Sequence, residues 1–282
     1  MKAPGLELRC AHATLSLERP QVMGVLNVTP DSFSDGGRFG SAAEAIAHGV
    51  RLASEGAGII DVGGESTRPG AAAVSLEEEL ERVLPVIEGL RRECAAIISV
   101  DTSRPEVMRA AAGAGAGLIN DVRALRTPGA LAAARESGCA VCLMHMQGEP
   151  RTMQDSPVYQ DVVAEVRAFL AERVAAARAA GFAASQLLID PGFGFGKTFE
   201  HNLTLLRHLR ELTRPDVPLL AGLSRKALLG RLTGRGPQER LHGSVALAVV
   251  AALGGARIIR AHDVAATVDA LKVVAALGPG EG

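Results

Sequence analysis

The stretch Val22-Met-Gly-Val-Leu-Asn-Val28, continuing as Thr29-Pro-Asp-Ser-Phe-Ser-Asp-Gly-Gly37, separates two candidate folds. Its first seven residues form a short, mostly apolar run that predicts a buried strand. A doubly wound dinucleotide-binding sheet places a Gly-x-Gly-x-x-Gly turn directly after its first strand. The turn in this chain carries Pro, Asp, Ser and Phe before its two glycines, which argues against that fold.

The same unit, an apolar run followed by a longer stretch with helical spacing, recurs eight times along the chain. This alternation predicts βα units and a parallel sheet. The predicted strands are Val22–Val28, Gly58–Val62, Ala96–Asp101, Gly117–Asp121, Ala140–His145, Gln186–Asp190, Val217–Leu223 and Arg257–Ala261. The predicted helices are Ser41–Glu55, Ser75–Glu93, Pro105–Ala112, Pro128–Ser137, Tyr159–Ala180, Phe199–Leu212, Pro237–Leu253 and Val264–Ala276. Eight units without a linker favour a closed (β/α)8 barrel of the TIM type over an open sheet.

Local signals support the helix starts and add one peripheral element. Ser41 and Ser75 are each followed three residues later by Glu, which matches a capping box. Glu7 to Leu17 alternates polar and apolar residues like a short hairpin that closes the bottom of the barrel. We therefore expect an N-terminal hairpin over residues 1–18 and a barrel domain over residues 19–282.

Composition excludes several classes of protein. Lys and Arg number 30 against 31 Asp and Glu, without a block of like charge, so neither a nucleic acid nor a membrane surface is an expected partner. Neither a signal peptide nor an apolar run long enough to span a membrane is visible, which predicts a cytoplasmic protein. The four cysteines fit free thiols, and the odd spacing of Cys139 and Cys142 in a strand points them to opposite faces.

Polar residues follow nearly every predicted strand. The active site of a (β/α)8 barrel lies at the C-terminal ends of its strands, so these residues are expected to share one mouth. Each single Asp or Asn is also common turn chemistry, but their coincidence predicts a site. The strand ends carry Asn27, Gly63–Gly70, Asp101–Arg104, Asn120 with Asp121, Met144 with His145, Asp190, Ser224–Lys226 and Arg260–His262.

One half of the predicted site is suited to a flat heterocycle. Asp101, Asn120, Asp190 and Lys226 offer carboxylate acceptors, one amide and one ammonium to a ring with N–H donors and carbonyl acceptors. A fused pyrimidinone fits this set. The alternative for Asp190 and Lys226 is a buried ion pair without a ligand.

The other half is suited to an anion. Arg68, Arg260 and His262 supply positive charge and N–H donors. Asn27 and neighbouring Asp oxygens are candidate ligands for Mg²⁺, which usually binds few protein groups together with substrate phosphates. For Arg68 and Arg260 the alternative is a solvated surface position.

Two loops combine glycine and proline with functional side chains, at residues 31–37 and 63–70. Loops of this composition are typical of lids that order over a substrate. The alternative is that both are plain turns.

Long segments resemble the dihydropteroate synthases. They run in the family's order and cover the chain from about residue 20 to residue 275, with no departure at the positions that match functional residues. The matching segments are Met23–Gly37, Asp61–Gly70, Val100–Arg104, Ile119–Asp121, Leu143–Met146, Asp190–Lys197, Gly222–Lys226 and Arg260–His262.

The resemblance implies an enzyme that condenses a dihydropterin pyrophosphate with p-aminobenzoate in folate synthesis, with Mg²⁺ and as a homodimer. It implies an SN1-like reaction in which departing pyrophosphate leaves a pterin-methyl cation. Pterin contacts are implied for Asp101, Asn120, Asp190 and Lys226, a pocket wall for Met144 and ring stacking for Arg260. Asn27 is implied as the Mg²⁺ ligand, and His262 and Arg68 as phosphate contacts. The p-aminobenzoate site is implied for Phe33, Asp35, Thr67, Arg68, Pro69, Phe195 and Ser224.

Two rival functions remain open on sequence grounds. A pterin-dependent methyltransferase barrel passes a methyl group to a corrinoid, but no histidine here lies in an Asp-x-His-x-x-Gly context. A catalytically silent paralogue would bind a pterin without turnover. Incubation with both substrates and Mg²⁺ separates these functions, since only a synthase releases pyrophosphate and forms dihydropteroate.

Overall fold

The computed structural model describes residues 6–28, 38–65, 74–149 and 152–278. Eight parallel strands form one sheet in the order β8-β7-β6-β5-β4-β3-β10-β9. A parallel bridge between Ile189 and Leu219 joins the two edges, so the sheet closes into a barrel. The strands are β3 (Gln21–Asn27), β4 (Ile59–Gly63), β5 (Ile97–Asp101), β6 (Leu118–Asp121), β7 (Ala140–Met144), β8 (Leu187–Asp190), β9 (Leu220–Gly222) and β10 (Ile258–Ala261). The predicted (β/α)8 barrel is confirmed.

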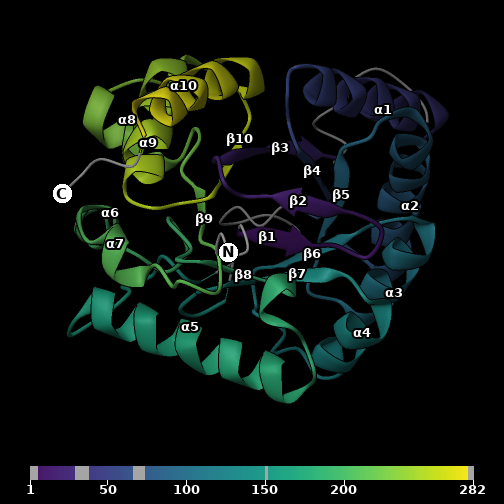
Figure 1. The fold of residues 1–282 in the computed structure, drawn as a ribbon, viewed down its shortest axis with the longest axis horizontal. Helices are drawn as coiled ribbons and strands as arrows, with labels where there is room; N and C mark the ends of the chain where they lie inside the picture. Colours follow the sequence, from purple (N-terminus) through teal and green to yellow (C-terminus); the bar gives the residue numbers. More distant parts are fainter. Residues whose placement is uncertain (1–5, 29–37, 66–73, 150–151, 279–282) are drawn as a thin grey trace, which may run out of the picture.

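Helices surround the strands on all sides of the barrel (Figure 1). Their inner faces pack on the aliphatic side chains that point outward from the strands. The helices are α1 (Arg38–Ser54), α2 (Leu76–Glu93), α3 (Pro105–Ala114), α4 (Ala130–Ser137), α5 (Val162–Ala179), α6 (Phe199–Arg207), α7 (Leu209–Leu212), α8 (Ala227–Thr233), α9 (Leu241–Leu253) and α10 (Val264–Leu277). Two short 3-10 helices are η2 (Ala184–Gln186) and η3 (Pro237–Glu239).

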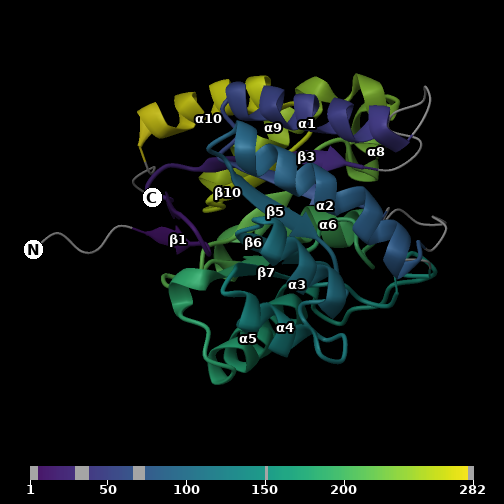
Figure 2. The ribbon, with the colours of Figure 1, turned by 90° about the vertical axis from the view of Figure 1, so that its right-hand side faces the viewer.

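An antiparallel hairpin of β1 (Glu7–Arg9) and β2 (Thr14–Ser16) covers the end of the barrel at which the strands begin (Figures 1 and 2). Its Leu8 and Leu17 are fully buried and pack against inward-pointing residues such as Met23 and Ile59. The alternation seen in the sequence arises because one face of the hairpin seals this apolar layer. The predicted closure of the barrel bottom is confirmed.

The barrel interior changes from apolar to polar along the strands. Near the hairpin it is filled by aliphatic side chains, which form one buried cluster with Leu8 and Leu17. Two residues further along β4, β5, β6, β8 and β10, the inward positions carry polar groups, and Asp61 and Ser99 are two of them. Because side chains alternate across a strand, the outward neighbours stay aliphatic and support the helices. The polar end is the end at which sequence analysis placed the site.

Several element boundaries differ from the predictions. Helix α1 begins at Arg38, so the predicted N-cap at Ser41 is wrong, whereas Ser75 accepts from the Glu78 backbone N–H at the start of α2 as predicted. The predicted helix Phe199–Leu212 is divided at His208, whose backbone leaves the helical region. Helix α8 was not predicted, because seven residues are too few to show helical periodicity.

The thiols behave as their spacing predicted. Cys139 packs in the outer cluster and Cys142 in the inner one, and both are free and buried. Burial raises the pKa of both thiols, so neither has the exposed, acidic character of a redox cysteine. Within the residues that the structure describes, no helix is long and apolar enough to span a membrane.

Candidate active site

An ion-pair network forms the floor of the barrel mouth. Arg260 on β10 donates from Nε to Asp61 Oδ2 at 2.7 Å and from Nη2 to Asp101 Oδ2 at 3.1 Å. The fully buried Asp61 also accepts from Ser99 Oγ at 2.6 Å and from Asn120 Nδ2 at 3.1 Å. A buried carboxylate with three side-chain donors is fully compensated for its loss of water.

Asp61 was not singled out from the sequence as a site residue. It lies in Ile59-Ile-Asp-Val-Gly63, where a single charge interrupts an apolar strand at an inward position. That interruption is a usable signal, since a central strand accommodates a charge only when the barrel interior supplies partners. Through Asp61, the positions of Asn120 and Arg260 become interdependent.

The charged groups at this floor shift one another's pKa values. Burial raises the pKa of Asp101 to about 7, and the neighbouring Asp61 carboxylate adds to the shift while Arg260 opposes it. For Arg260 burial alone would lower the pKa, but Asp61 and Asp101 outweigh it and raise the pKa above its usual value. The guanidinium therefore stays charged, and Asp101 titrates near neutral pH.

Asp190 and Lys226 lie on adjacent parts of the mouth without a direct ion pair. Asp190 at the end of β8 accepts from the Gly192 N–H at 2.7 Å. Lys226 Nζ donates to the Phe193 carbonyl oxygen and lies 4.8 Å from the centroid of the Phe195 ring. Burial raises the pKa of Asp190 and lowers that of Lys226 to about 8, and each charge opposes the shift of the other. The ligand-free ion pair considered from the sequence does not form.

An apolar wall stands beside these polar groups. Met144 packs with Val122, Met146 and Met153, and Phe195 lies against this cluster. Polarisable thioethers and an aromatic ring suit the face of a planar ring, while the carboxylates and amide suit its edge. The mouth thus offers a slot for a flat polar heterocycle.

Gly63 lies between two residues whose side chains carry oxygen atoms. It is the register neighbour of both Asn27 on β3 and Asp101 on β5. A Cβ at Gly63 would lie 3.7 Å from Asn27 Oδ1 and 3.6 Å from the Asp101 Cβ. Among the described residues no cluster of three His, Cys, Asp or Glu side chains has the geometry of a metal site. An amide oxygen next to a residue without a side chain fits Mg²⁺ that takes its other ligands from water and phosphate.

Ser224 and His262 join the ends of two neighbouring strands. The His262 backbone N–H donates to Ser224 Oγ at 3.2 Å, and His262 Nδ1 lies 3.0 Å from the same oxygen. Both residues lie on the β9 and β10 side of the mouth, next to Arg260. The predicted strand-end residues 27, 101, 120, 144, 190, 224, 226, 260 and 262 are thus brought to one end of the barrel.

Asp121 is separated from this group despite following Asn120. Its side chain points away from the barrel interior and accepts from the backbone N–H groups of Arg123 at 2.8 Å and Leu125 at 2.7 Å and from Ser103 Oγ. These bonds hold Ala124 and Leu125 at positive φ. Asp121 therefore shapes a loop, and only Asn120 faces the mouth.

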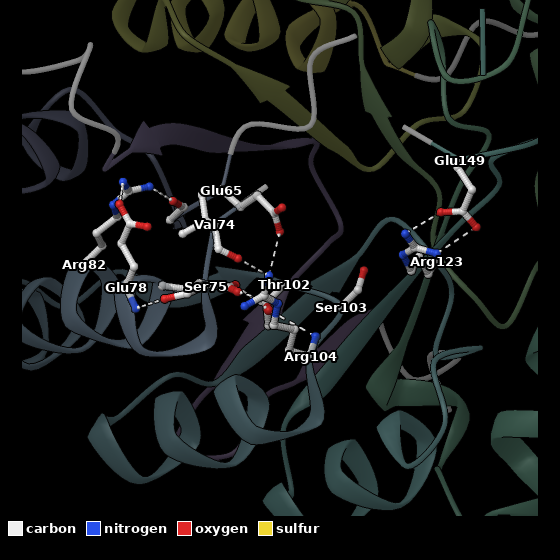
Figure 3. A network of polar contacts seen from close by, with 12 residues as sticks. Glu65, Val74, Ser75, Glu78, Arg82, Thr102, Ser103, Arg104, Arg123 and Glu149 are labelled. Carbon is white, nitrogen blue, oxygen red and sulfur yellow. Dashed lines mark hydrogen bonds and ion pairs between the residues drawn. The ribbon is translucent and has the colours of Figure 1, made fainter. Parts of the chain in front are cut away.

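Phe33, Asp35, Thr67, Arg68 and Pro69 lie outside the described residues. The residues that flank positions 66–73 are described, and Arg104 links them. Its Nη2 donates to the Val74 carbonyl oxygen and lies 3.9 Å from a Glu65 carboxylate oxygen (Figure 3).

Behind this link, Arg104 Nε lies 3.2 Å from the buried Glu79, which also accepts from Thr102 Oγ1 at 2.6 Å. Burial raises the pKa of Glu79, and the Thr102 hydrogen bond and Arg104 charge oppose that shift. A cavity of about 540 Å³ opens beside this network. Its lining includes Asp101, Val122, Arg123 and Glu149, so it continues outward from the slot.

The fold and the mouth together define a pterin-binding barrel enzyme, and a family model described as "Pterin binding enzyme" matches residues 23–262. The chain is 55% identical to the dihydropteroate synthase of Escherichia coli (strain K12) over 271 residues, 96% of each protein. The chain belongs to the dihydropteroate synthases.

Solved structures agree with this membership. A Xanthomonas albilineans dihydropteroate synthase with 4-aminobenzoic acid has a TM-score of 0.92 and 58% identity, covering 97% of this chain and 98% of that one. A structure of the enzyme from the same organism in complex with 7,8-dihydropteroate has a TM-score of 0.88 and 56% identity, covering 96% and 98%. The Xanthomonas albilineans enzyme is thus seen with 4-aminobenzoic acid in one structure and with 7,8-dihydropteroate in the other.

Proposed function

We propose that this chain joins 6-hydroxymethyl-7,8-dihydropterin pyrophosphate to p-aminobenzoate and releases 7,8-dihydropteroate and pyrophosphate. The observation that carries the proposal is the placement of Asp101, Asn120, Asp190 and Lys226 at one end of the barrel, beside the apolar wall of Met144 and Phe195. The ligands bound by the similar solved enzymes support the same pair of substrates.

In this proposal the pterin edge binds Asp101, Asn120, Asp190 and Lys226, and Met144 packs on its face. Asn120 uses one amide proton on Asp61 at 3.1 Å, which leaves its oxygen as an acceptor for a ring N–H. Arg260 lies under the ring, held by two carboxylates. A pre-formed slot lowers the cost of ordering the substrate.

The leaving group is proposed to lie on the β3 and β10 side of the mouth. Asn27 would hold Mg²⁺ beside Gly63, and the ion when bound neutralises negative charge on the pyrophosphate oxygens. His262 and Arg68 would donate to the same oxygens. Charge stabilisation of a departing pyrophosphate is an electrostatic task that needs no nucleophilic side chain.

The proposed reaction is SN1-like. The bond between the pterin methylene carbon and the pyrophosphate oxygen breaks first, and its electron pair leaves with pyrophosphate. The p-aminobenzoate nitrogen then forms a bond to the methylene carbon and loses one proton. Asp101 and Asp190 would stabilise the pterin-methyl cation electrostatically, at a site where low solvent exposure strengthens the interaction.

The second substrate is proposed to bind outside the pterin slot. Phe195 and Ser224 are the described residues assigned to it, and the assignment of Phe33, Asp35, Thr67, Arg68 and Pro69 rests on the family resemblance. We assign to Phe33 and Asp35 the exclusion of water from the cation. Replacing either is then expected to lower product formation while pterin pyrophosphate still binds.

The experiment that tests the function is incubation of the purified protein with both substrates and Mg²⁺. Release of pyrophosphate together with dihydropteroate supports the proposal, and addition of a chelator should abolish both. Binding of the pterin without turnover would indicate a silent paralogue, and methyl transfer to a corrinoid would indicate a methyltransferase.

We also propose that the chain acts as a homodimer in the cytoplasm. Helices α9 and α10 are adjacent (Figure 1) and expose Val250, Leu253, Val273 and Leu277. Apolar side chains gathered on neighbouring helices are typical of an interface between copies of a chain. The four free cysteines support a reducing compartment.

A further inference from the structure

Lys197 is a buried cation that the proposed reaction does not use. It is 3% exposed and lies just before the Thr198 N-cap of α6. Its Nζ lies 2.9 Å from His145 Nδ1 and 3.0 Å from the carbonyl oxygens of Gly192 and Phe195. The His145 carbonyl oxygen is a fourth, more distant acceptor at 3.4 Å, so the three N–H donors of the ammonium group are all satisfied.

Burying the Lys197 ammonium group away from water costs free energy, which its neighbours must offset. Lys197 forms no ion pair with a carboxylate of the described residues, so main-chain carbonyls and one imidazole compensate its desolvation. Burial lowers the pKa of Lys197 to about 7, and the charge of Asp190 opposes the shift. Burial also lowers the pKa of His145 to about 3, which keeps its ring neutral and able to accept from Lys197.

The bonds of Lys197 fasten one loop to one strand. The loop is residues 191–196, between β8 and α6, and the strand is β7, which ends next to His145. The loop lies directly on the β7 end, since a Cβ at Gly192 would lie 1.9 Å from the His145 carbonyl oxygen. At Gly196, which like Gly192 has a positive φ, a Cβ would lie 2.3 Å from the Gln147 carbonyl oxygen. Only glycine permits both the backbone conformation and the approach.

The same loop holds Lys226. The Phe193 carbonyl oxygen accepts from Lys226 Nζ, and the Phe195 ring faces the same ammonium at 4.8 Å. Lys197 bonds the carbonyls of Gly192 and Phe195, which bracket Phe193 in the chain. The two lysines are therefore connected through the backbone of residues 192–195.

We propose that Lys197 is a positioning residue, whose ammonium fixes the 191–196 loop so that the Phe193 carbonyl and the Phe195 ring place Lys226 for the pterin. The inference rests on the proposed function, because Lys226 matters only if a pterin binds there. Lys197 itself lies behind the loop and does not reach the substrate.

A double-mutant cycle on pterin pyrophosphate binding tests this coupling. We expect Lys197→Met to weaken the affinity about tenfold, as for loss of one charge-assisted hydrogen bond at Lys226. We expect the Lys197→Met, Lys226→Met double variant to bind as Lys226→Met does, within about twofold. A loss in the double variant equal to the product of the two single losses, or unchanged binding by Lys197→Met, overturns the inference.

Two further variants complete the test. One is a control, and the other replaces Lys197→Met if that variant does not fold. Tyr159→Phe removes the 2.8 Å hydrogen bond to the Gly196 carbonyl, on the part of the loop that does not touch Lys226. Its effect should be small and additive with Lys226→Met. If Lys197→Met does not fold, His145→Leu takes its place, because it removes the imidazole contact at 2.9 Å and leaves only the longer bond to the carbonyl oxygen of residue 145. That variant should weaken binding non-additively with Lys226→Met, and additivity again overturns the inference.

The outcomes separate the inference from the proposed function. If the wild type makes dihydropteroate but Lys197→Met binds pterin pyrophosphate with unchanged affinity, only the role given to Lys197 is rejected. A wild-type protein that does not bind pterin pyrophosphate removes both.

Discussion

Arg260 Nε lies 2.7 Å from Asp61 Oδ2, and this pair stands at the centre of the polar half of the barrel. Asp61 has no exposure to solvent, and Ser99 and Asn120 complete its hydrogen bonds. The pair sets the height and direction of the guanidinium that the proposed pterin ring covers. Stability and substrate binding therefore depend on the same carboxylate.

Replacing Asp61 with Asn should be strongly destabilising. The substitution leaves the part-buried guanidinium with Asp101 as its one carboxylate partner among the described residues, and breaking a buried ion pair costs about 3–5 kcal/mol. Urea denaturation measures the change. Asp216→Asn is the matched control, because it breaks an exposed pair with Arg178 and should cost less than about 1 kcal/mol. Equal losses in the two variants would contradict the role given to Asp61.

Asn120 and Asp121 should separate binding from stability. Asn120→Ala removes a proposed pterin contact, so the Kd for pterin pyrophosphate should rise about tenfold. Asp121→Ala leaves two backbone N–H groups without their acceptor and should lower the free energy of unfolding by about 2 kcal/mol or more, with the Kd changed less than about threefold. Calorimetric titration and urea denaturation give the two values. A raised Kd for Asp121→Ala with an unchanged Kd for Asn120→Ala would contradict the conclusion that Asn120 faces the mouth and Asp121 points away from it.

Arg104→Lys should raise the KM for p-aminobenzoate about fivefold, because Arg104 holds the residues that flank positions 66–73, where three residues assigned to p-aminobenzoate lie. The KM for pterin pyrophosphate should rise less, since only Arg68 of that segment is assigned to its phosphates. Lysine carries one compact ammonium group, which does not contact the Glu79 and Glu65 carboxylates and the Val74 carbonyl oxygen at the same time. Steady-state kinetics with each substrate varied provides the measurement. Arg109→Lys, on an exposed pair with Glu136, is the control. An unchanged KM in a stably folded Arg104→Lys protein would count against the prediction.

Lys197 should make stability depend on pH. Its pKa is about 7 in the folded protein and 10.5 ordinarily, so between these values the unfolded chain binds more protons. The stability of the wild type relative to Lys197→Met should therefore rise as the pH increases from 7 to 10. Asp190 and Lys226 act on Lys197 but are present in both proteins. Urea denaturation across this range gives the difference, and a flat difference would exclude a shifted Lys197.

The α9 and α10 surface should control the oligomeric state. We expect the wild type to sediment with the mass of two chains of 29.2 kDa, and Val250→Glu with Val273→Glu to sediment as one chain, because two buried charges oppose association. Val158→Glu, which alters an exposed apolar residue elsewhere, should leave the dimer intact. A wild type that sediments as one chain at all concentrations would remove the homodimer proposal.

Some features followed from the sequence alone. Eight apolar runs, each followed by a helical stretch, are local patterns of period 2 or 3.6, and each is set by neighbours within about 20 residues. The (β/α)8 barrel follows because few other folds satisfy eight such units. Strand-end residues such as Asp190 and Arg260 could likewise be placed at one mouth, since all parallel strands end on the same side.

Tertiary structure decided what local pattern leaves open. Whether Asn120 or Asp121 faces the barrel depends on the register of β6 against β5 and β7, which adjacent residues do not encode. Asp61 gains its ion-pair partner only when folding brings Arg260, which is 199 residues away in the sequence, next to it. Lys197 likewise gains its role from a loop folded onto β7. These partners are distant in sequence. A charge needs a partner only once it is buried, and it is buried only after the barrel has closed.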